Sequence, residues 1–282
     1  KILKKIIIKI PLLAEFYRFR RDLKYLESKI KYREKLGFYF NGLPSMEQGE
    51  FEVEETKIFD NILPFFDLFI NVGANTGYYV CRALSKGKDT IAFEPNQLNV
   101  NILLENINAN KFSSNFQLFP IALGSRTGLI PMYGSSTGAS LIKGWAGQYR
   151  SKLIPISKFD TLADSIINEK KCLFFVDIEG FELEFLKGAI SILNADNHVF
   201  VIEISVSEHQ PSGIKVNPNL LETFKLMFFH NYKAYTANID LRRVEIKEIE
   251  KIIKTGENTL TTHNFLFIKN SLSLSKIGLK KI

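Results

Sequence analysis

A buried strand that ends in a glycine turn constrains this chain more than any other feature of its sequence. Residues 69–79 read FINVGANTGYY, which predicts a strand that opens directly into a helix. Glu94 ends the next apolar run, about 20 residues further on. This layout is typical of sites for adenosine-containing cofactors, because the N–H groups of the turn face an anionic part of the ligand and the acid accepts hydrogen bonds from the ribose.

The residues within the turn depart from the dinucleotide pattern. In the G-x-G-x-x-G fingerprint, the second glycine lets the backbone approach a pyrophosphate and the third packs the helix on the strand. Asn75 and Tyr78 stand at those two places in this chain. A bulkier loop suits a cofactor without a pyrophosphate, of which S-adenosylmethionine is the common one. A helix-capping turn in some other α/β protein is the alternative that this motif leaves open.

Strand and helix patterns alternate over the middle of the chain. We expect strands at residues 68–72, 90–93, 116–121, 173–176 and 199–204, and helices at residues 77–86, 97–109, 181–193 and 219–229. Residues 36–60 read as an irregular or short-stranded lead-in, and residues 232–236 and 265–268 as late strands joined by a turn region. Such alternation predicts a mostly parallel sheet with helices on both faces and ligands at the carboxyl ends of its strands.

Residues 122–158 interrupt this alternation. They are rich in glycine and serine and contain Trp145 and Tyr149. An insertion of this kind near the strand ends is a candidate lid or acceptor-binding loop. A β-hairpin at the edge of the sheet, followed by a surface connection, fits the same residues equally well.

Composition limits the size, the compartment and the partners. With 282 residues, 45% of them hydrophobic, the chain can bury one large core. Cys81 and Cys172 fall inside a predicted helix and a predicted strand, which indicates buried thiols in a reducing cytoplasm. Beyond residue 35 the chain holds 25 basic and 26 acidic residues, so its body lacks the basic character of nucleic-acid binders and we expect no such partner.

The net charge of +7 belongs to an N-terminal arm. Residues 1–35 carry 12 Lys/Arg against 4 Asp/Glu, and apolar residues recur among them at helical spacing. A basic amphipathic helix with aromatic side chains over residues 1–26 predicts an anchor at an anionic membrane surface. The alternatives are a helix packed on the body or on a second subunit of a homodimer, and a disordered terminus. No apolar run reaches the length of a membrane span.

Acidic residues follow the predicted strand at 173–176. Asp177 comes directly after it, Glu179 points to the same side if the chain stays extended, and Glu182 falls in the first turn of the next helix. Three carboxylates are therefore expected at the rim where a ligand should lie. The alternative is that these acids complement a helix N-terminus, which accounts for Glu182 but not for Asp177.

A further acid ends the next predicted strand. Glu203 lies within an apolar run, where a charged residue needs a partner or a function. His209 follows in a polar loop and is a candidate to take a proton from an attacking hydroxyl. A histidine in such a loop is more often only solvated.

Together these motifs resemble the FkbM family of S-adenosylmethionine-dependent methyltransferases over roughly residues 60–270. The matching residues are the turn at 71–79, Ala92-Phe-Glu-Pro-Asn96, Asn106, Ala122-Leu-Gly124, Phe159-Asp-Thr-Leu162, the Asp177-x-Glu-Gly-x-Glu182 run with Leu186-Lys-Gly-Ala189, and Ile202-Glu203. The run from Asp177 to Glu182 is the most specific part, because it follows the glycine turn and its acid in the expected order.

The resemblance implies the class I methyltransferase Rossmann-like fold, a seven-stranded mostly parallel sheet whose last strand is inserted antiparallel. It implies an arm and lead-in over residues 1–59, a methyltransferase domain over 60–270 and a basic tail over 271–282. The glycine turn would line the methionine end of the cofactor, Glu94 would hold the ribose, and the backbone at 122–123 would border the adenine. The expected cofactor contacts are Asn71, Gly73, Asn75, Gly77, Tyr78, Glu94, Pro95, Ala122, Leu123 and Asp177.

One residue departs from the family's pattern. The family usually has an acid where this chain has Asn71, and an amide there accepts a hydrogen bond but brings no charge for the ammonium of the cofactor. Two consequences stay open. Cofactor binding is weakened, or the chain is an inactive relative.

The resemblance also implies an activity, O-methylation of a sugar, glycan or other small-molecule hydroxyl. We expect Asp177 or Glu179 as the general base, assisted by Glu203 and His209. No metal is expected, although one held by Asp177, Glu179 and Glu203 is a less favoured alternative. We expect a cytoplasmic protein that is peripheral at the inner face of the membrane. The rival hypotheses are a nicotinamide oxidoreductase, a nucleic-acid amino-methyltransferase and a non-catalytic membrane-associated scaffold.

Overall fold

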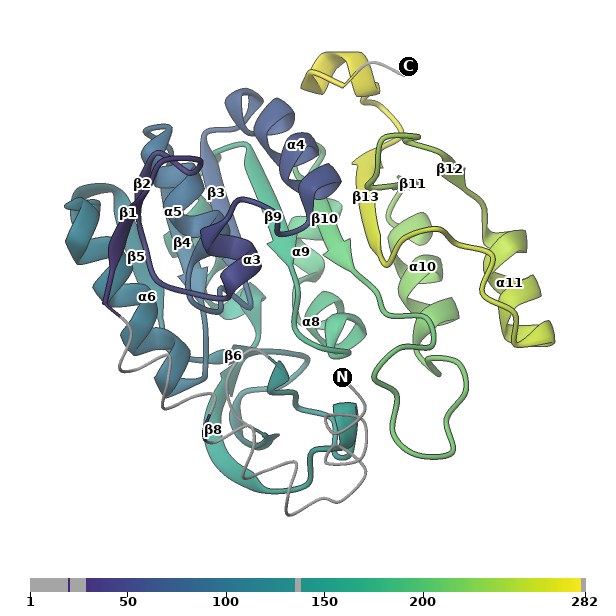
Figure 1. The fold of residues 1–282 in the computed structure, drawn as a ribbon. Helices are drawn as coiled ribbons and strands as arrows, with labels where there is room; N and C mark the ends of the chain where they lie inside the picture. Colours follow the sequence, from purple (N-terminus) through teal and green to yellow (C-terminus); the bar gives the residue numbers. More distant parts are fainter. Residues whose placement is uncertain (1–19, 21–28, 135–137, 280–282) are drawn as a thin grey trace.

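A central sheet with helices on both faces organises the structure (Figure 1). The computed structural model describes residue 20, residues 29–134 and residues 138–279. Within this part of the chain the sheet has eight strands in the order β12-β11-β13-β10-β9-β3-β4-β5. They are β3 (Leu68–Val72), β4 (Asp89–Phe93), β5 (Phe116–Phe119), β9 (Cys172–Val176), β10 (Val199–Glu203), β11 (Tyr232–Thr236), β12 (Arg243–Val244) and β13 (Asn264–Lys269).

The directions of the strands confirm the expected fold. The neighbours from β5 to β10 pair in parallel, and β13 lies antiparallel between β10 and β11. The described sheet has eight strands rather than seven because the two-residue β12 pairs with β11, through Ala234 and Val244. The parallel strands place the chain segments that follow them at one edge of the sheet.

Each face of the sheet packs against its own set of helices. Side chains that alternate along each strand form two cores, so that Phe69 belongs to one and Ile70 to the other. The first core is covered by α4 (Val53–Ile62), α5 (Tyr78–Ser85) and α6 (Gln97–Asn110). The second is covered by α7 (Ala163–Ile167), α8 (Glu182–Lys187), α9 (Ile190–Asn194), α10 (Leu220–Phe229) and α11 (Ile246–Thr255).

Helices that we did not expect lie in two segments: residues 36–60, which read as irregular or short-stranded, and the turn region before β13. The lead-in holds a hairpin of β1 (Lys31–Arg33) and β2 (Phe38–Phe40), then α3 (Pro44–Glu47) and α4. Phe40 and Phe59 from this lead-in are fully buried in the first core. The turn region expected before β13 contains α11, whose Ile249 and Ile252 are also fully buried. The isoleucines of α11 recur at helical spacing, so the turn expected there is wrong and the local pattern indicated a helix. In both places tertiary burial stabilises the helix.

The helix predicted over residues 181–193 is divided at Gly188. A Cβ atom on Gly188 would lie 1.9 Å from the backbone oxygen of Gly124, so the chain can only be this close without a side chain. The helix α8 ends at Lys187 and α9 begins at Ile190.

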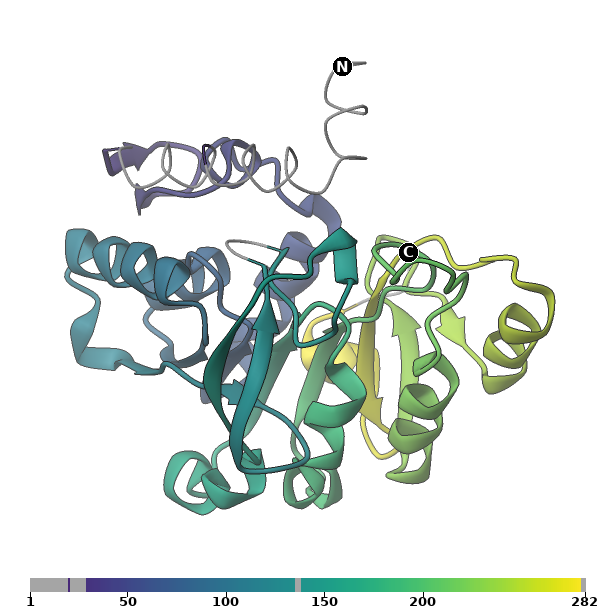
Figure 2. The same ribbon diagram turned by 90° about the horizontal axis from the view of Figure 1, so that it is seen from below.

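The interrupting segment forms a small sheet of its own (Figure 2). Its strands are β6 (Ala122–Leu123), β7 (Gly128–Tyr133) and β8 (Ser151–Ser157), and β7 pairs with β8 antiparallel. The hairpin that we expected therefore exists, but it is not an edge of the main sheet. The connection between β7 and β8 carries a short 3-10 helix, η4 (Trp145–Gly147).

The arm predicted over residues 1–26 lies outside the described residues, apart from Arg20. Among the residues that the structure describes, no helix is both long enough and apolar enough to cross a membrane.

Candidate active site

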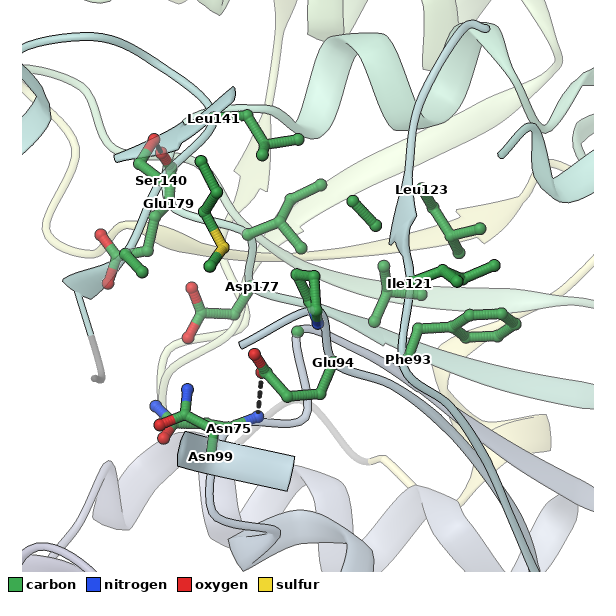
Figure 3. Close-up of a pocket in the computed structure, with 17 residues that line it drawn as sticks. Asn75, Phe93, Glu94, Asn99, Ile121, Leu123, Ser140, Leu141, Asp177 and Glu179 are labelled. Atoms are coloured by element: carbon green, nitrogen blue, oxygen red, sulfur yellow. Dashed lines mark hydrogen bonds between the residues drawn. The ribbon is translucent and has the colours of Figure 1, made fainter. Parts of the chain in front are cut away.

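Glu94 holds the glycine turn after β3 in shape. Its Oε2 accepts a hydrogen bond from the backbone N–H of Asn75 at 2.7 Å (Figure 3). Its Oε1 accepts one from the backbone N–H of Asn96 at 2.8 Å. Burial raises the pKa of Glu94, and the N–H groups of Asn96 and Asn75 oppose that shift. The acid at the end of β4 is thus oriented by the turn that it supports.

The turn itself can be built only with glycine at two places. Gly73 has a φ of +84°, and a Cβ there would lie 1.8 Å from the backbone oxygen of Asp177. Gly77 has a φ of +88°, and a Cβ there would lie 3.0 Å from Leu103 on α6. Gly77 therefore packs the turn on a helix, and it lines neither of the two cavities described next. Asn75 also adopts a left-handed φ, of 52°, which asparagine tolerates better than most residues.

A cavity lies beside this turn, at the carboxyl ends of β3, β4 and β9, and holds about 600 Å³ when the space open to solvent is counted. The residues expected to bind a cofactor that line it are Gly73, Asn75, Glu94, Pro95, Ala122, Leu123 and Asp177. One end is polar, with Asn75, Asp177 and Glu179 (Figure 3). The other is apolar, with Phe93, Ile121 and Leu123. The same cavity can thus hold a charged group at one end and a flat apolar ring at the other.

Asn71 and Tyr78 line a second, smaller cavity of about 350 Å³, which shares Asp177 with the first. The side chain of Asn71 is 3% exposed, and its Nδ2 donates to the backbone oxygen of Phe175 at 3.3 Å. An ionised carboxylate has no proton to donate to that carbonyl. The amide at this place therefore satisfies a buried backbone group that an acid would leave without this donor.

Partly buried acids gather on the sheet face that α4 covers. Asp177 follows β9, Glu203 ends β10, and Glu52 reaches them from the residue before α4. Burial, and then the nearby charge of Glu179, raise the pKa of Asp177 well above its usual range. Burial and Asp177 do the same for the pKa of Glu203, and burial raises the pKa of Glu52 to about 7. Tyr79 donates from its hydroxyl to Glu52 Oε2 at 2.8 Å.

Glu179 is bound to the inserted segment. The indole Nε1 of Trp145 donates to Glu179 Oε2 at 2.6 Å, and Trp145 is 1% exposed. A Cβ on Gly180 would lie 2.6 Å from the Trp145 ring, so the glycine lets the indole pack on the turn. The extended geometry expected for residues 177–179 is wrong, because β9 ends at Val176 and Glu179 has a left-handed φ of 55°.

His209 lies beside Glu179 but lines neither cavity described above. Its backbone oxygen accepts from the N–H of Ala146, and its ring centroid is 6.2 Å from that of Trp145. The imidazole is exposed, and its charge lowers the pKa of Glu179 against the larger effect of burial. Its catalytic role stays a prediction.

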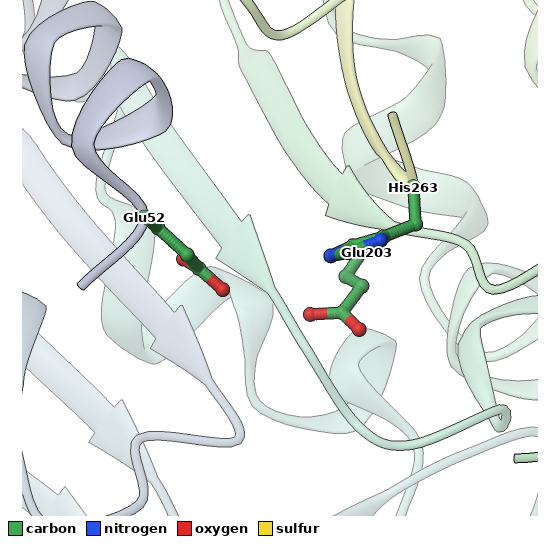
Figure 4. Close-up of side chains that lie close together, drawn as sticks. All are labelled: Glu52, Glu203 and His263. Carbon is green, nitrogen blue, oxygen red and sulfur yellow. The ribbon is translucent and has the colours of Figure 1, made fainter. Parts of the chain in front are cut away.

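A second group of side chains includes Glu203 but not Glu179. Ligand atoms of Glu52, Glu203 and His263 all lie within 4.8 Å of one another (Figure 4). The alternative metal set of Asp177, Glu179 and Glu203 is thus not the one that the fold brings together among the described residues. Glu52, His263 and Trp145 are the site residues to which sequence reasoning assigned no role, because each comes from a segment without a motif.

The strand order and the cavity define a class I methyltransferase fold. The sequence profile described as "Methyltransferase FkbM domain" matches residues 71–234. The chain therefore belongs to the FkbM methyltransferase family and carries a methyltransferase domain.

Solved structures include several similar folds. Methyltransferase FkbM from Methylobacillus flagellatus is 18% identical with a TM-score of 0.45, over 72% of this chain and 43% of that one. A precorrin-6y C5,15-methyltransferase from Geobacter metallireducens is 12% identical with a TM-score of 0.43, over 85% and 98% of the two chains. The match thus spans less than half of the Methylobacillus protein. Among curated proteins, none matches this sequence.

Proposed function

We propose that this protein is an S-adenosylmethionine-dependent O-methyltransferase whose acceptor is a hydroxyl of a sugar or glycan. The observation that carries the proposal is the cavity at the carboxyl ends of the strands. The glycine turn, Glu94 and Asp177 line it together. Family membership supports methyl transfer. The oxygen acceptor and the glycan rest on the resemblance and on the chemistry of the acids.

The residues of the cavity fit this cofactor. Glu94 already accepts two backbone hydrogen bonds, but each carboxylate oxygen has a second lone pair for a ribose hydroxyl. The close contact between Gly73 and Asp177 leaves the turn free of side-chain atoms where the methionine end would lie. Phe93, Ile121 and Leu123 offer an apolar wall to the adenine.

The acids fit the charge of the same cofactor. When bound, S-adenosylmethionine supplies a methyl group that is carried on a positively charged sulfur. The acceptor oxygen would bond to the methyl carbon, and the electron pair of the carbon–sulfur bond would go to sulfur. Asp177 faces the polar end of the cavity and would attract both the sulfonium and the ammonium. The uncharged Asn71 leaves this attraction to Asp177.

Asp177 is also the best-placed general base. A base is most effective when its pKa lies near the working pH, and burial with neighbouring acids moves the pKa of Asp177 upward from the low range of an ordinary aspartate. Glu179 is engaged with Trp145, and His209 lies outside the cavity lining. We therefore assign Asp177 as the base that takes the proton of the acceptor hydroxyl, and Glu203 as the acid next to Asp177.

The place of action is part of the same proposal. The basic amphipathic pattern of residues 1–26 supports binding to an anionic membrane surface at its cytoplasmic side. An enzyme held there would reach lipid-linked or cell-surface glycans. The alternative is that residues 1–26 pack on a second subunit and form a homodimer.

The test combines cofactor binding with turnover. We expect calorimetry of the full chain to show one S-adenosylmethionine site. Asp177→Asn should lower methyl transfer to the accepted glycan of a panel by about 100-fold or more, which is the usual contribution of a general base. Glu184→Gln is the matched control. That acid lies on the same helix as Glu182, but it bonds Ser125 and Lys187 instead of lining the cavity.

Two results would count against the proposal in different ways. Unchanged turnover in Asp177→Asn would remove the base assignment alone. Failure of the wild-type chain to bind S-adenosylmethionine would favour the non-catalytic scaffold, and binding of NAD in its place would favour the oxidoreductase.

A further inference from the structure

We propose that Glu52, Glu203 and His263 form a binding site for a divalent transition-metal ion at the carboxyl end of β10. The three side chains come from separate parts of the fold. Glu52 precedes α4, Glu203 ends β10, and His263 precedes β13. Figure 4 shows Glu52 extending from its helix toward the other two. The site goes beyond methyl transfer, which needs no metal.

The spacing suits an ion between the ligands. Two atoms that bind one ion at about 2.2 Å can be at most about 4.4 Å apart. The ligand atoms of Glu52, Glu203 and His263 lie within 4.8 Å of one another, so a few tenths of an ångström of movement would bring all three to one ion. Neither carboxylate is within ion-pair distance, 4.0 Å, of the His263 ring, so no direct contact fills this space.

A buried amide beside the three residues supports the site independently. Asn264 is fully buried, and its Oδ1 has no hydrogen-bond partner among the described residues. It lies directly opposite Glu203 in the β10–β13 ladder, which puts both side chains on the same face of the sheet. An unsatisfied buried oxygen costs about 1–3 kcal/mol, and an ion or its bound water would supply the missing partner.

The charge of the region favours a cation. Glu52 and Glu203 meet at the site, and Asp177 follows β9, the parallel neighbour of the strand β10 that Glu203 ends. Within the part of the chain that the structure describes, none of these three acids forms an ion pair with lysine or arginine. One imidazole with two carboxylates is a mixed nitrogen–oxygen set, which fits Mn²⁺ or Zn²⁺ better than the all-oxygen shells of Mg²⁺ and Ca²⁺.

The position next to Asp177 gives the ion a use in the reaction. Three protein ligands leave coordination positions open, and an oxygen of the acceptor would occupy one of them. The ion would then hold this oxygen near Asp177, which lines the main cavity. This role rests on the proposed function, whereas the binding of the ion does not.

The experiment measures metal binding by the full chain after treatment with a chelator. We expect MnCl₂, followed by electron paramagnetic resonance, to show one site with a dissociation constant below about 1 mM, and ZnCl₂ to compete for it. Glu203→Gln and His263→Ala should each weaken Mn²⁺ binding by at least about 10-fold. Glu222→Gln is the control, because that exposed acid lies on α10 and outside the site.

The proposal fails if wild-type protein binds no Mn²⁺ in this range, or if Glu203→Gln and His263→Ala bind it like the wild type. Urea unfolding of both variants separates lost metal binding from lost folding. Calorimetry with S-adenosylmethionine on the same samples separates the two proposals. Mn²⁺ binding without cofactor binding would overturn the proposed function and keep the metal site.

Discussion

Glu182 shows what burial does to a single carboxyl group in this protein. It is 3% exposed, and its Oε1 accepts a hydrogen bond from the N–H of Gly180 at 2.9 Å. Burial raises the pKa of Glu182 to about 7, although that hydrogen bond opposes the shift. Glu182, which the sequence places in the first turn of a helix, thus stabilises the loop that holds Asp177 and Glu179 through its hydrogen bond to Gly180.

The raised pKa predicts a dependence of stability on pH. The folded state keeps a proton on Glu182 from the usual pKa of 4.5 up to about 7, where the unfolded state has lost it. The stability that Glu182 contributes is therefore full below pH 4.5 and is lost as the pH rises to about 7. Glu182→Gln removes this titration. The unfolding free energy of the variant minus that of the wild type should therefore be larger at pH 8 than at pH 5, by roughly 2–3 kcal/mol.

Urea unfolding at the two pH values measures this gain. Glu184→Gln is the control, since the pKa of Glu184 is lowered, by hydrogen bonds to Lys187 and Ser125 that outweigh burial. A constant difference between Glu182→Gln and the wild type across this pH range would show that Glu182 does not titrate there.

The connection between β7 and β8 is an element whose role depends on one side chain. Trp145 in η4 packs on Gly180 and donates to Glu179, and the N–H of Ala146 bonds the loop of His209. Its contacts join two loops that follow β9 and β10. The segment read from sequence as a lid or acceptor-binding loop therefore contacts the acidic turn through a buried indole.

Trp145→Phe tests this contact and keeps an aromatic ring at the buried position. The variant loses the donor to Glu179, and because that hydrogen bond lowers the pKa of Glu179, the pKa should rise. We expect methyl transfer to fall by about 10-fold. Its acidic limb, which Asp177 sets, should move to lower pH, because a Glu179 that keeps its proton raises the pKa of Asp177 less. The affinity for S-adenosylmethionine should change by less than about 3-fold, because Trp145 does not line the cavity.

The pH profile of turnover and calorimetry with the cofactor provide the two readouts. Tyr149→Phe is a control in the same connection, where Tyr149 is half exposed. An equal loss of cofactor affinity and turnover in Trp145→Phe would indicate a general loosening of the site instead.

At the scale of the whole molecule, the charges are unevenly distributed. Residues 1–35 carry an excess of eight positive charges, whereas the rest of the chain is close to neutral. Each lysine or arginine near an anionic bilayer contributes about 1 kcal/mol to binding. The arm alone could therefore hold the catalytic body at a membrane surface.

Deletion of residues 1–20 tests the arm. The deletion removes six basic residues, and binding to vesicles that contain phosphatidylserine should fall by at least about 100-fold in a sedimentation assay. Vesicles of phosphatidylcholine alone and 0.5 M salt are the controls, because both remove the electrostatic attraction. Retained cofactor binding would show that the shortened chain is folded. Equal binding with and without the arm would leave dimerisation as its use, which sedimentation equilibrium measures.

Much of the fold and half of the site could be read from local sequence patterns. Alternating apolar runs identified the strands of the sheet, because a parallel sheet buries each strand on both faces. Gly73, Glu94 and Asp177 could be identified because spacing from strand ends is a property of the chain itself. Some residues that match the motifs of the family stabilise the fold and do not line the site. Asp160 accepts from the first N–H groups of α9, and Asn106 binds the backbone of Asn41 and Thr76.

Other features were decided by tertiary structure alone. The helix α4, the separate sheet of β6 to β8, and the break at Gly188 all depend on contacts between distant parts of the chain. The same is true of Glu52, Trp145 and His263, which meet the acids of the strand ends only after folding. Sequence determined which residues end the strands. Packing decided which of them share a buried, low-dielectric space, and that sharing is what alters their pKa values.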